Sequence, residues 1–334
     1  MDIKEQKKIV DDLLKNKKKQ LKPNDTFQFK CTACGKCCWN IDVLINCYDM
    51  IRIRNGLKLS TKEIFEKNYI NFYLGPSSGL PVVTLNFLKM GESKFTHCPF
   101  LKPIIKTDKI LKKIKEKAKG DLKEMNRLLS FIKTNPEESH KILGKLEIDS
   151  WLCSIHKNRP IICRLYPCGR IQKIDTKTKE KKEMFMLQED QKGFCPGFKE
   201  KETTTLKNYL SSQDFWQYQE GSNLFTKIVN FLISNGLYVE MDKNKKSKDK
   251  SILDPKSIII YFIGNLLHNF DSFNTFSKDP RVIKTIYDEN STHDDFMYVE
   301  NKIFNTIRGF AKLMKEKPSE NEFKTLIKNL TNKI

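Results

Sequence analysis

The chain has 334 residues, which is long enough for two domains. It is 39% hydrophobic and 31% charged, and its many aliphatic and aromatic residues exclude a disordered composition. A net charge of +20 is compatible with an anionic partner, such as an acidic protein, a membrane surface or nucleic acid. Most of this charge comes from lysines along predicted helices, while arginines that could read bases are scarce. A solvated basic surface is therefore favoured, and nucleic acid is disfavoured without being excluded.

The N-terminal segment lacks the apolar core of a signal peptide, and no apolar run reaches the length of a transmembrane helix. We therefore expect a cytoplasmic protein. The ten cysteines all lie before residue 196. In a reducing compartment, cysteines at this density are expected to hold metal or to act as redox groups rather than to form disulfides.

Three parts are predicted along the chain. Residues 1–22 have the pattern of a basic amphipathic helix, which breaks at Pro23. Residues 23–200 hold the cysteines and are expected to form a small metal-binding domain with short strands. A lysine-rich helical insertion without cysteine interrupts this domain at residues 103–149. Residues 201–334 are predicted to be an all-helical domain of open role, so the predicted fold class is α+β.

The densest stretch is Cys31-Thr-Ala-Cys34-Gly-Lys-Cys37-Cys38. Each CxxC pair lets two thiolates converge on one ion at about 2.3 Å. Gly35, between the second pair, is expected to adopt a positive φ. Adjacent side chains in most backbone conformations point in different directions, so Cys37 and Cys38 rarely serve one tetrahedral ion together. The stretch therefore predicts two metal sites or one multinuclear cluster, with ligands from elsewhere.

Local signals place the regular elements. Ser60 and Glu63 form a capping box that begins a helix, and an alternating apolar pattern predicts a strand from Pro81. In the cysteine domain we expect strands at residues 39–45 and 81–87, helices at 47–53, 60–72, 108–119 and 122–133 with a third short helix before residue 149, and a hairpin of 170–174 with 183–187. In the helical domain we expect helices at residues 201–219, 223–234, 255–270, 280–287, 294–315 and 319–333, with a charged linker at 242–250.

Four motifs occur in order: Cys31-x-x-Cys34-x-x-Cys37-Cys38, then Cys98-Pro-Phe-Leu, then Cys153-x-Ile-x-x-x-Arg159-Pro160-x-x-Cys163-Arg164-x-Tyr166-Pro167, then Cys195-x-Gly197. This series resembles the YkgJ-type CxxCxxCC cysteine-cluster family of zinc- or iron-chelating domains. The resemblance covers residues 27–200 without the insertion. A more distant resemblance, in the cysteine region alone, is to the cysteine domain of flagellin lysine methylases. The resemblance implies metal binding by eight cysteines, namely Cys31, Cys34, Cys37, Cys38, Cys98, Cys153, Cys163 and Cys195. Cys47 and Cys168 lie outside the motifs.

The identity of the metal stays open between zinc, iron and an iron–sulfur cluster. Cys31, Cys34 and Cys37 match the first three ligands of a bacterial ferredoxin run, but the fourth would fall at Ile41. Zinc in one or two closed Cys₄ sites is the second interpretation. A mixed site that uses His97 or His156 is the third and least favoured. Eight thiols exceed what one structural zinc needs, so an iron–sulfur cluster is slightly favoured.

Arg159, Arg164 and Arg170 crowd the third motif, and their expected role is to offset the negative charge of thiolate ligands. No nucleotide-binding glycine loop, radical-SAM spacing, GxSxG or HExxH occurs, so whether the protein is an enzyme stays open. The predicted function is metal binding in support of redox or group-transfer chemistry. The alternative is a zinc-stabilised interaction module with a basic helical domain that binds its partner.

Overall fold

The computed structural model describes residues 20–32, 34–75, 80–89, 96–104, 107–134, 150–174, 181–188, 193, 195–237, 255–315 and 325. Residues 1–19 of the predicted N-terminal helix and the charged linker lie outside these residues, as does almost all of the last predicted helix. The end of the N-terminal prediction is wrong, because Gln20 and Leu21 form a strand that pairs with residues 185–186. Within them, helices combine with small antiparallel sheets, which confirms the α+β class.

Helix α2 (Cys47–Leu57) is the centre of the fold, and its residues are buried from Cys47 to Asn55. It begins with a capping box, in which Asn46 accepts a hydrogen bond from the nitrogen of Asp49 and the Asp49 carboxylate accepts one from Asn46. It ends where Lys58 adopts a left-handed conformation, with φ 56°. The predicted helix at this position is confirmed and is longer than expected.

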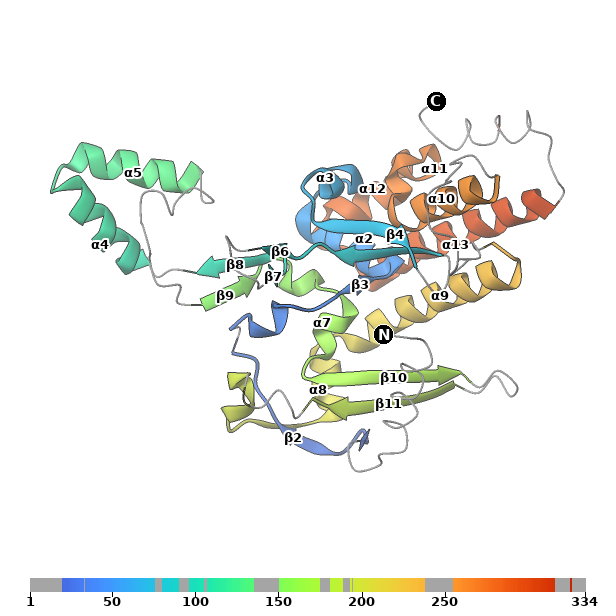
Figure 1. Cartoon of the computed structure of the whole chain (residues 1–334), viewed down its shortest axis with the longest axis horizontal. Helices are drawn as coiled ribbons and strands as arrows, with labels where there is room; N and C mark the ends of the chain where they lie inside the picture. The colour runs from blue at the N-terminus through green and yellow to red at the C-terminus, as the bar shows by residue number, and fades with distance from the viewer. Residues whose placement is uncertain are drawn as a thin grey trace, which may run out of the picture.

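The largest hydrophobic core surrounds α2. In this core Tyr48 and Ile51 of α2 pack with side chains of residues 201–334, including Tyr218 and Phe296. The hydrophobic contacts thus cross the predicted boundary at residue 200. Figure 1 shows α2 among the C-terminal helices. These are α9 (Phe215–Ser234), α10 (Pro255–His268), η7 (Phe270–Ser272), α11 (Asn274–Ser277), α12 (Pro280–Tyr287) and α13 (His293–Lys315).

The chain between residues 201 and 234 differs from the prediction of two helices separated at residues 220–222. It forms the strand β12 (Thr203–Thr205), the helix α8 (Leu206–Ser212) and α9, and the break between the two helices lies at Asp214, with φ 52°. The β-branched threonines of β12 pair antiparallel with β2 (Thr26–Gln28), so residues 201–334 are not all helical.

Two three-stranded antiparallel sheets flank the helices. The first has the order β3 (Leu44–Ile45), β5 (Pro81–Leu85), β4 (Ile70–Leu74), and the second has the order β1 (Gln20–Leu21), β11 (Lys181–Leu187), β10 (Cys168–Ile174). The expected strand from Pro81 and the β10–β11 hairpin are confirmed. The strand expected at 39–45 is reduced to β3 and an isolated bridge at Trp39.

Helix α3 (Thr61–Glu66) has the predicted capping box of Ser60 and Glu63 but ends about six residues early. The chain turns at Asn68, with φ 55°, and continues as β4, because Ile70 and Phe72 pair with β5. The cross-strand pairing outweighs the helical pattern of this segment.

The insertion leaves and returns through two paired strands, β8 (Leu101–Ile104) and β9 (Ser150–Cys153). Its helices α4 (Thr107–Ala118) and α5 (Leu122–Thr134) are both present, and they pack around a small core of Ile114, Ala118 and Leu128. The third helix expected before residue 149 lies outside the described residues. Figure 1 shows α4 and α5 standing apart from the rest of the chain. Among the helices that the structure describes, none has the length and apolarity needed to cross a membrane.

Candidate metal centre

The first cysteine stretch ends in the 3-10 turn η2 (Lys36–Cys38). Gly35 precedes this turn with φ 70°, which confirms the expected positive φ. The turn brings the Sγ atoms of Cys37 and Cys38 to 4.0 Å, although neighbouring side chains were expected to diverge. Two sulfurs on one tetrahedral zinc lie about 3.8 Å apart when each bond is about 2.3 Å. Cys37 and Cys38 can therefore face a common ion.

Main-chain hydrogen bonds join this turn to the next two cysteine segments. The nitrogen of Cys98, which follows the two-residue strand β7 (Thr96–His97), donates to the carbonyl oxygen of Cys38 at 2.9 Å. β7 itself pairs with β6 (Leu88–Lys89). Leu101 on β8 pairs with Cys153 on β9. Three segments that are far apart in the sequence thus meet through backbone contacts.

Cys163 comes to the same place on the short helix α7 (Ile161–Leu165). The Ile161 nitrogen donates to the Asp49 carboxylate at 2.9 Å, which holds α7 against α2. Burial raises the pKa of Cys163, and the neighbouring thiols add to this effect. Burial also raises the pKa of Cys98 to about 12. We call the cysteines gathered here the first thiol group: Cys37, Cys38, Cys98, Cys153 and Cys163.

The other three motif cysteines are Cys31, Cys34 and Cys195, and we refer to them together as the second thiol group. The nitrogen of Lys30, next to Cys31, donates at 3.0 Å to the carbonyl oxygen of Gly197 in the turn η6 (Pro196–Lys199). Burial raises the pKa of Tyr166, and the neighbouring Cys195 and the more distant Cys37 and Cys34 raise it further. Tyr166 therefore lies beside both groups.

The two cysteines outside the motifs have different surroundings. Cys47 is fully buried in the helical core, where Glu300 and Asp49 are its charged neighbours. Cys168 begins β10 and lies in the same hydrophobic cluster as Cys195. Burial raises the pKa of Cys168 to about 12. Cys168 thus shares a hydrophobic cluster with Cys195, whereas Cys47 lies in the helical core.

The structure gathers the cysteine-bearing segments without arranging their thiols as a ligand set. Over the described residues, no group of three or more Cys, His, Asp or Glu side chains is placed to hold a metal ion. Among the described thiols, those of Cys37 and Cys38 lie 4.0 Å apart. Thiols as a class suit zinc, iron or an iron–sulfur cluster.

The two histidines that could act as further ligands have other partners. His97 Nδ1 lies 3.0 Å from the carbonyl oxygen of Cys98, which accepts a hydrogen bond from it. Both ring nitrogens of His156, in the turn η4 (His156–Asn158), lie 3.0 Å from Arg159. Burial and the Arg159 charge lower the pKa of His156.

Two of the three predicted arginines face the thiols. Arg159 opposes the rise in pKa at Cys37 and Cys153, so its charge stabilises thiolates there. Arg164, next to Cys163, is 2% exposed. Arg170 instead pairs with Glu183 and stacks on Phe215.

Arg164 belongs to a buried polar network that the sequence did not single out. Its guanidinium donates to the Tyr218 hydroxyl at 2.8 Å and to the carbonyl oxygen of Gln213 at 2.7 Å. Arg52 donates to the same Tyr218 hydroxyl at 2.9 Å. This network ties the thiol groups to α2 and α9. The one signal in the sequence is that Arg52 lies between two isoleucines of α2, Ile51 and Ile53.

Comparison with protein-family models, with curated proteins and with solved structures finds no match to this chain. The resemblance to the YkgJ-type family thus stays a prediction that rests on the four motifs.

Proposed function

We propose that this protein binds iron or zinc through its eight motif cysteines, in a centre that supports redox or group-transfer chemistry. The observation that carries the proposal is the convergence of four separate cysteine segments. The nitrogen of Cys98 donates a hydrogen bond to the carbonyl oxygen of Cys38, β8 pairs with β9 at Cys153, and α7 carries Cys163. Thiols bind these metals as thiolates, so binding releases protons and adds its free energy to that of folding.

The arginines beside the thiols support the same proposal. Four thiolates on a divalent ion carry a net charge of about −2. The Arg159 charge opposes the rise in the pKa of Cys37 and Cys153, and the Arg164 charge does the same at Cys153. Their positive charge offsets that of the ligands, and Tyr218 holds Arg164 in place. An iron–sulfur cluster held here would supply electron transfer or a site for group transfer.

The insertion favours a second candidate function, a zinc-stabilised interaction module. Helix α4 carries five lysines against two acidic residues, and the α4–α5 hairpin projects from the body (Figure 1). A projecting basic arm suits an acidic protein partner. In this candidate the thiol groups hold structural zinc, and binding resides in the arm.

One preparation tests both candidates. The protein is purified without oxygen, and its iron, zinc and acid-labile sulfide are measured together with a visible spectrum. Iron with matching sulfide supports the redox centre. Zinc without sulfide supports the interaction module, and a charge-reversal variant at Lys112, Lys113 and Lys115 then tests binding to polyglutamate. Less than about 0.2 metal ions of either kind per chain contradicts both.

A further inference from the structure

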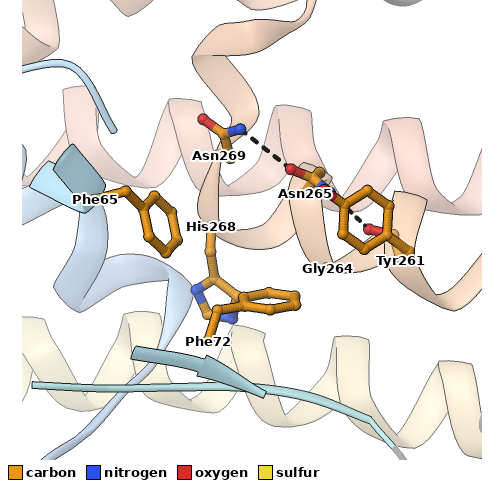
Figure 2. Close-up of a pocket in the computed structure, with 7 residues that line it drawn as sticks. All are labelled: Phe65, Phe72, Tyr261, Gly264, Asn265, His268 and Asn269. Atoms are coloured by element: carbon orange, nitrogen blue, oxygen red, sulfur yellow. Dashed lines mark hydrogen bonds between the residues drawn. The ribbon is translucent and has the colours of Figure 1, made fainter. Parts of the chain in front are cut away.

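Two apolar features of the described chain lie apart from the motif cysteines. The first is a cavity of about 270 Å³ between α10, α3 and β4, with Phe65, Phe72 and His268 in its lining (Figure 2). The protein encloses both ring nitrogens of His268, which have no hydrogen-bond partner among the described residues, so a molecule in the cavity cannot reach them. The described lining therefore does not distinguish one occupant from another. The second feature is a face of the β1–β11–β10 sheet.

This sheet packs one face, which we call the inner face, against α9. Phe185 on β11 contacts Phe215 of α9, with ring centroids 5.6 Å apart. Arg170, which pairs with Phe185, stacks on the same Phe215. Leu21 of β1 also pairs with Phe185, and both belong to the hydrophobic cluster that includes Cys195.

The opposite face, which we call the outer face, carries apolar side chains as well. Successive side chains of a strand point to opposite faces, so Met184 and Met186 on β11 lie on the outer face, together with Ile171, which pairs with Met184. Met184 is 8% exposed, and the other two side chains are half-buried. None of the three belongs to a hydrophobic cluster of the described residues. Another part of the chain is therefore needed to cover Met184.

Residues 1–19 are outside the described residues, and they adjoin this sheet directly. Gln20, the next residue, pairs with Met186 at the edge of the sheet. In the sequence, Ile3, Val10 and Leu14 recur at helical spacing and share one side of the predicted amphipathic helix. That apolar side has no partner within a single helix, so it needs an apolar surface to pack against.

The lengths of the two partners also agree. A helix over residues 2–19 would be about 27 Å long. The seven-residue strands β10 and β11 are each about 23 Å long. One such helix can therefore cover the outer face from end to end.

The other undescribed segments next to the sheet have few apolar residues. The turn between β10 and β11, residues 175–180, is Asp-Thr-Lys-Thr-Lys-Glu. Residues 189–192, after β11, are Glu-Asp-Gln-Lys, and Phe194 is a single aromatic residue beyond them. Neither segment offers a row of apolar side chains, whereas residues 1–19 do.

We propose that residues 2–19 form a helix whose apolar side packs on the outer face of this sheet, over Met184, Met186 and Ile171. The inner face of the same sheet belongs to the cluster that contains Cys168 and Cys195, so the helix supports the sheet behind these two thiols. The proposal is independent of metal binding.

The first test measures how fast hydrogen peroxide oxidises each methionine of the full chain, by mass spectrometry of its peptides. The combined change Val10→Gln and Leu14→Gln removes two apolar side chains of the segment. Met184 and Met186 should then be oxidised at least about fivefold faster than in the wild type, because their sulfurs become accessible. Met50, which is fully buried in α2, should stay protected and reports that the chain is folded.

The matched control is Lys8→Gln combined with Lys15→Gln, which places two glutamines on the opposite side of the predicted helix. Its oxidation rates at Met184 and Met186 should stay within about twofold of the wild type. Unchanged rates in Val10→Gln/Leu14→Gln would overturn the proposal, and so would an equal increase in both variants.

A second test uses the wild-type sequence and does not depend on how the variants fold. Photo-methionine, a diazirine analogue, replaces methionine throughout the chain, and light cross-links each analogue to its neighbours. Cross-links from positions 184 and 186 should lead to residues 1–19 of the same chain. Cross-links that lead only to residues 175–180, to residues 189–194 or to a second chain would overturn the proposal, as would the absence of any cross-link into residues 1–19.

Discussion

The nitrogen of Cys98 donates a hydrogen bond of 2.9 Å to the carbonyl oxygen of Cys38. These residues belong to different motifs, so the bond fixes the distance between their backbones whether or not a metal is bound. The same segment connects to a third motif, because Leu101, three residues after Cys98, pairs with Cys153. The position of the first thiol group therefore depends on backbone bonds as well as on any metal.

The first prediction separates motif cysteines from Cys47. Cys98→Ser should lower the metal content of anaerobically purified protein by at least half, because it removes one thiolate from the first thiol group. It should also lower the free energy of unfolding by several kcal/mol, since binding contributes to folding. Cys47→Ala is the matched control, because Cys47 is buried in the helical core away from both thiol groups.

For Cys47→Ala we expect unchanged metal content, measured by elemental analysis, and a loss of about 1 kcal/mol in stability. Equal metal content in the two variants would contradict the assignment of Cys98 as a ligand.

The second prediction concerns two helical glycines. In α9 a Cβ on Gly221 would lie 2.3 Å from Tyr48 Cγ, whereas a Cβ on Gly309 in α13 would meet nothing within 4 Å. Gly221→Ala should therefore lower the free energy of unfolding by about 2 kcal/mol or more, despite the higher helix propensity of alanine. Gly309→Ala should raise it by about 0.5–1 kcal/mol. Urea denaturation measures both, and a stabilising Gly221→Ala would show that α2 and α9 do not pack as described.

Gly221 also shows where prediction from the sequence ends. The capping box of Ser60 and Glu63 was predictable because its partners lie three residues apart. The predicted helices left residues 220–222 between them, although Gly221 lies within α9. A glycine is needed there because Tyr48, which is distant in the sequence, packs against it. In the same way α3 ends early because β4 pairs with β5. Elements that depend on residues close in the sequence were predicted correctly. Elements whose ends depend on contacts between distant residues were not.

The same distinction between local and long-range information holds for the candidate site. The motifs gave the eight cysteines, and no local signal could show that Cys37 and Cys38 turn their sulfurs towards each other. His268 had no signal at all, because a single histidine near the end of an apolar helix has the sequence pattern of an ordinary core residue. Its ring nitrogens have no hydrogen-bond partner among the described residues, which is a property of the fold and not of the local sequence.

The third prediction concerns Glu300 on α13, which is fully buried with no hydrogen-bond partner for either carboxylate oxygen among the described residues. Burial raises its pKa, and Asp49 and Glu220 add to this effect. A raised carboxyl pKa means that the folded chain holds its proton at a pH where the unfolded chain has lost it. Glu300 therefore contributes a loss of stability as pH rises above about 4.3, the usual pKa of glutamate.

Glu300→Met removes this dependence and should raise the free energy of unfolding by about 1–3 kcal/mol at pH 8. The gain should be smaller at pH 5, as measured by urea denaturation at both values. Exposed Glu289→Met is the control and should change little at either pH. A gain that is equal at pH 5 and pH 8 would mean that Glu300 does not titrate differently in the folded chain.

The fourth prediction concerns Asp279, which caps α12 by accepting hydrogen bonds from the nitrogens of Arg281, at 2.8 Å, and Val282, at 3.2 Å. It also accepts one from the Tyr298 hydroxyl at 2.9 Å and pairs with Lys302, both on α13. Burial alone would raise the pKa of Asp279, but these four donors outweigh it and lower the pKa to about 2.

Because the folded pKa is below the unfolded value of about 3.9, the ionised carboxylate stabilises the fold above pH 4, and this stabilisation is lost as pH falls towards 2. Asp279→Asn keeps a capping side chain but loses the charge, so it should be less stable than the wild type at pH 6 and should approach it below pH 3. Asp279→Ala loses the cap as well and should remain about 1 kcal/mol less stable at both ends of the range. Exposed Asp294→Asn is the control, for which we expect a difference under about 0.5 kcal/mol throughout. If the Asp279→Asn deficit were the same at pH 3 and pH 6, the link between α12 and α13 would not depend on the charge of Asp279.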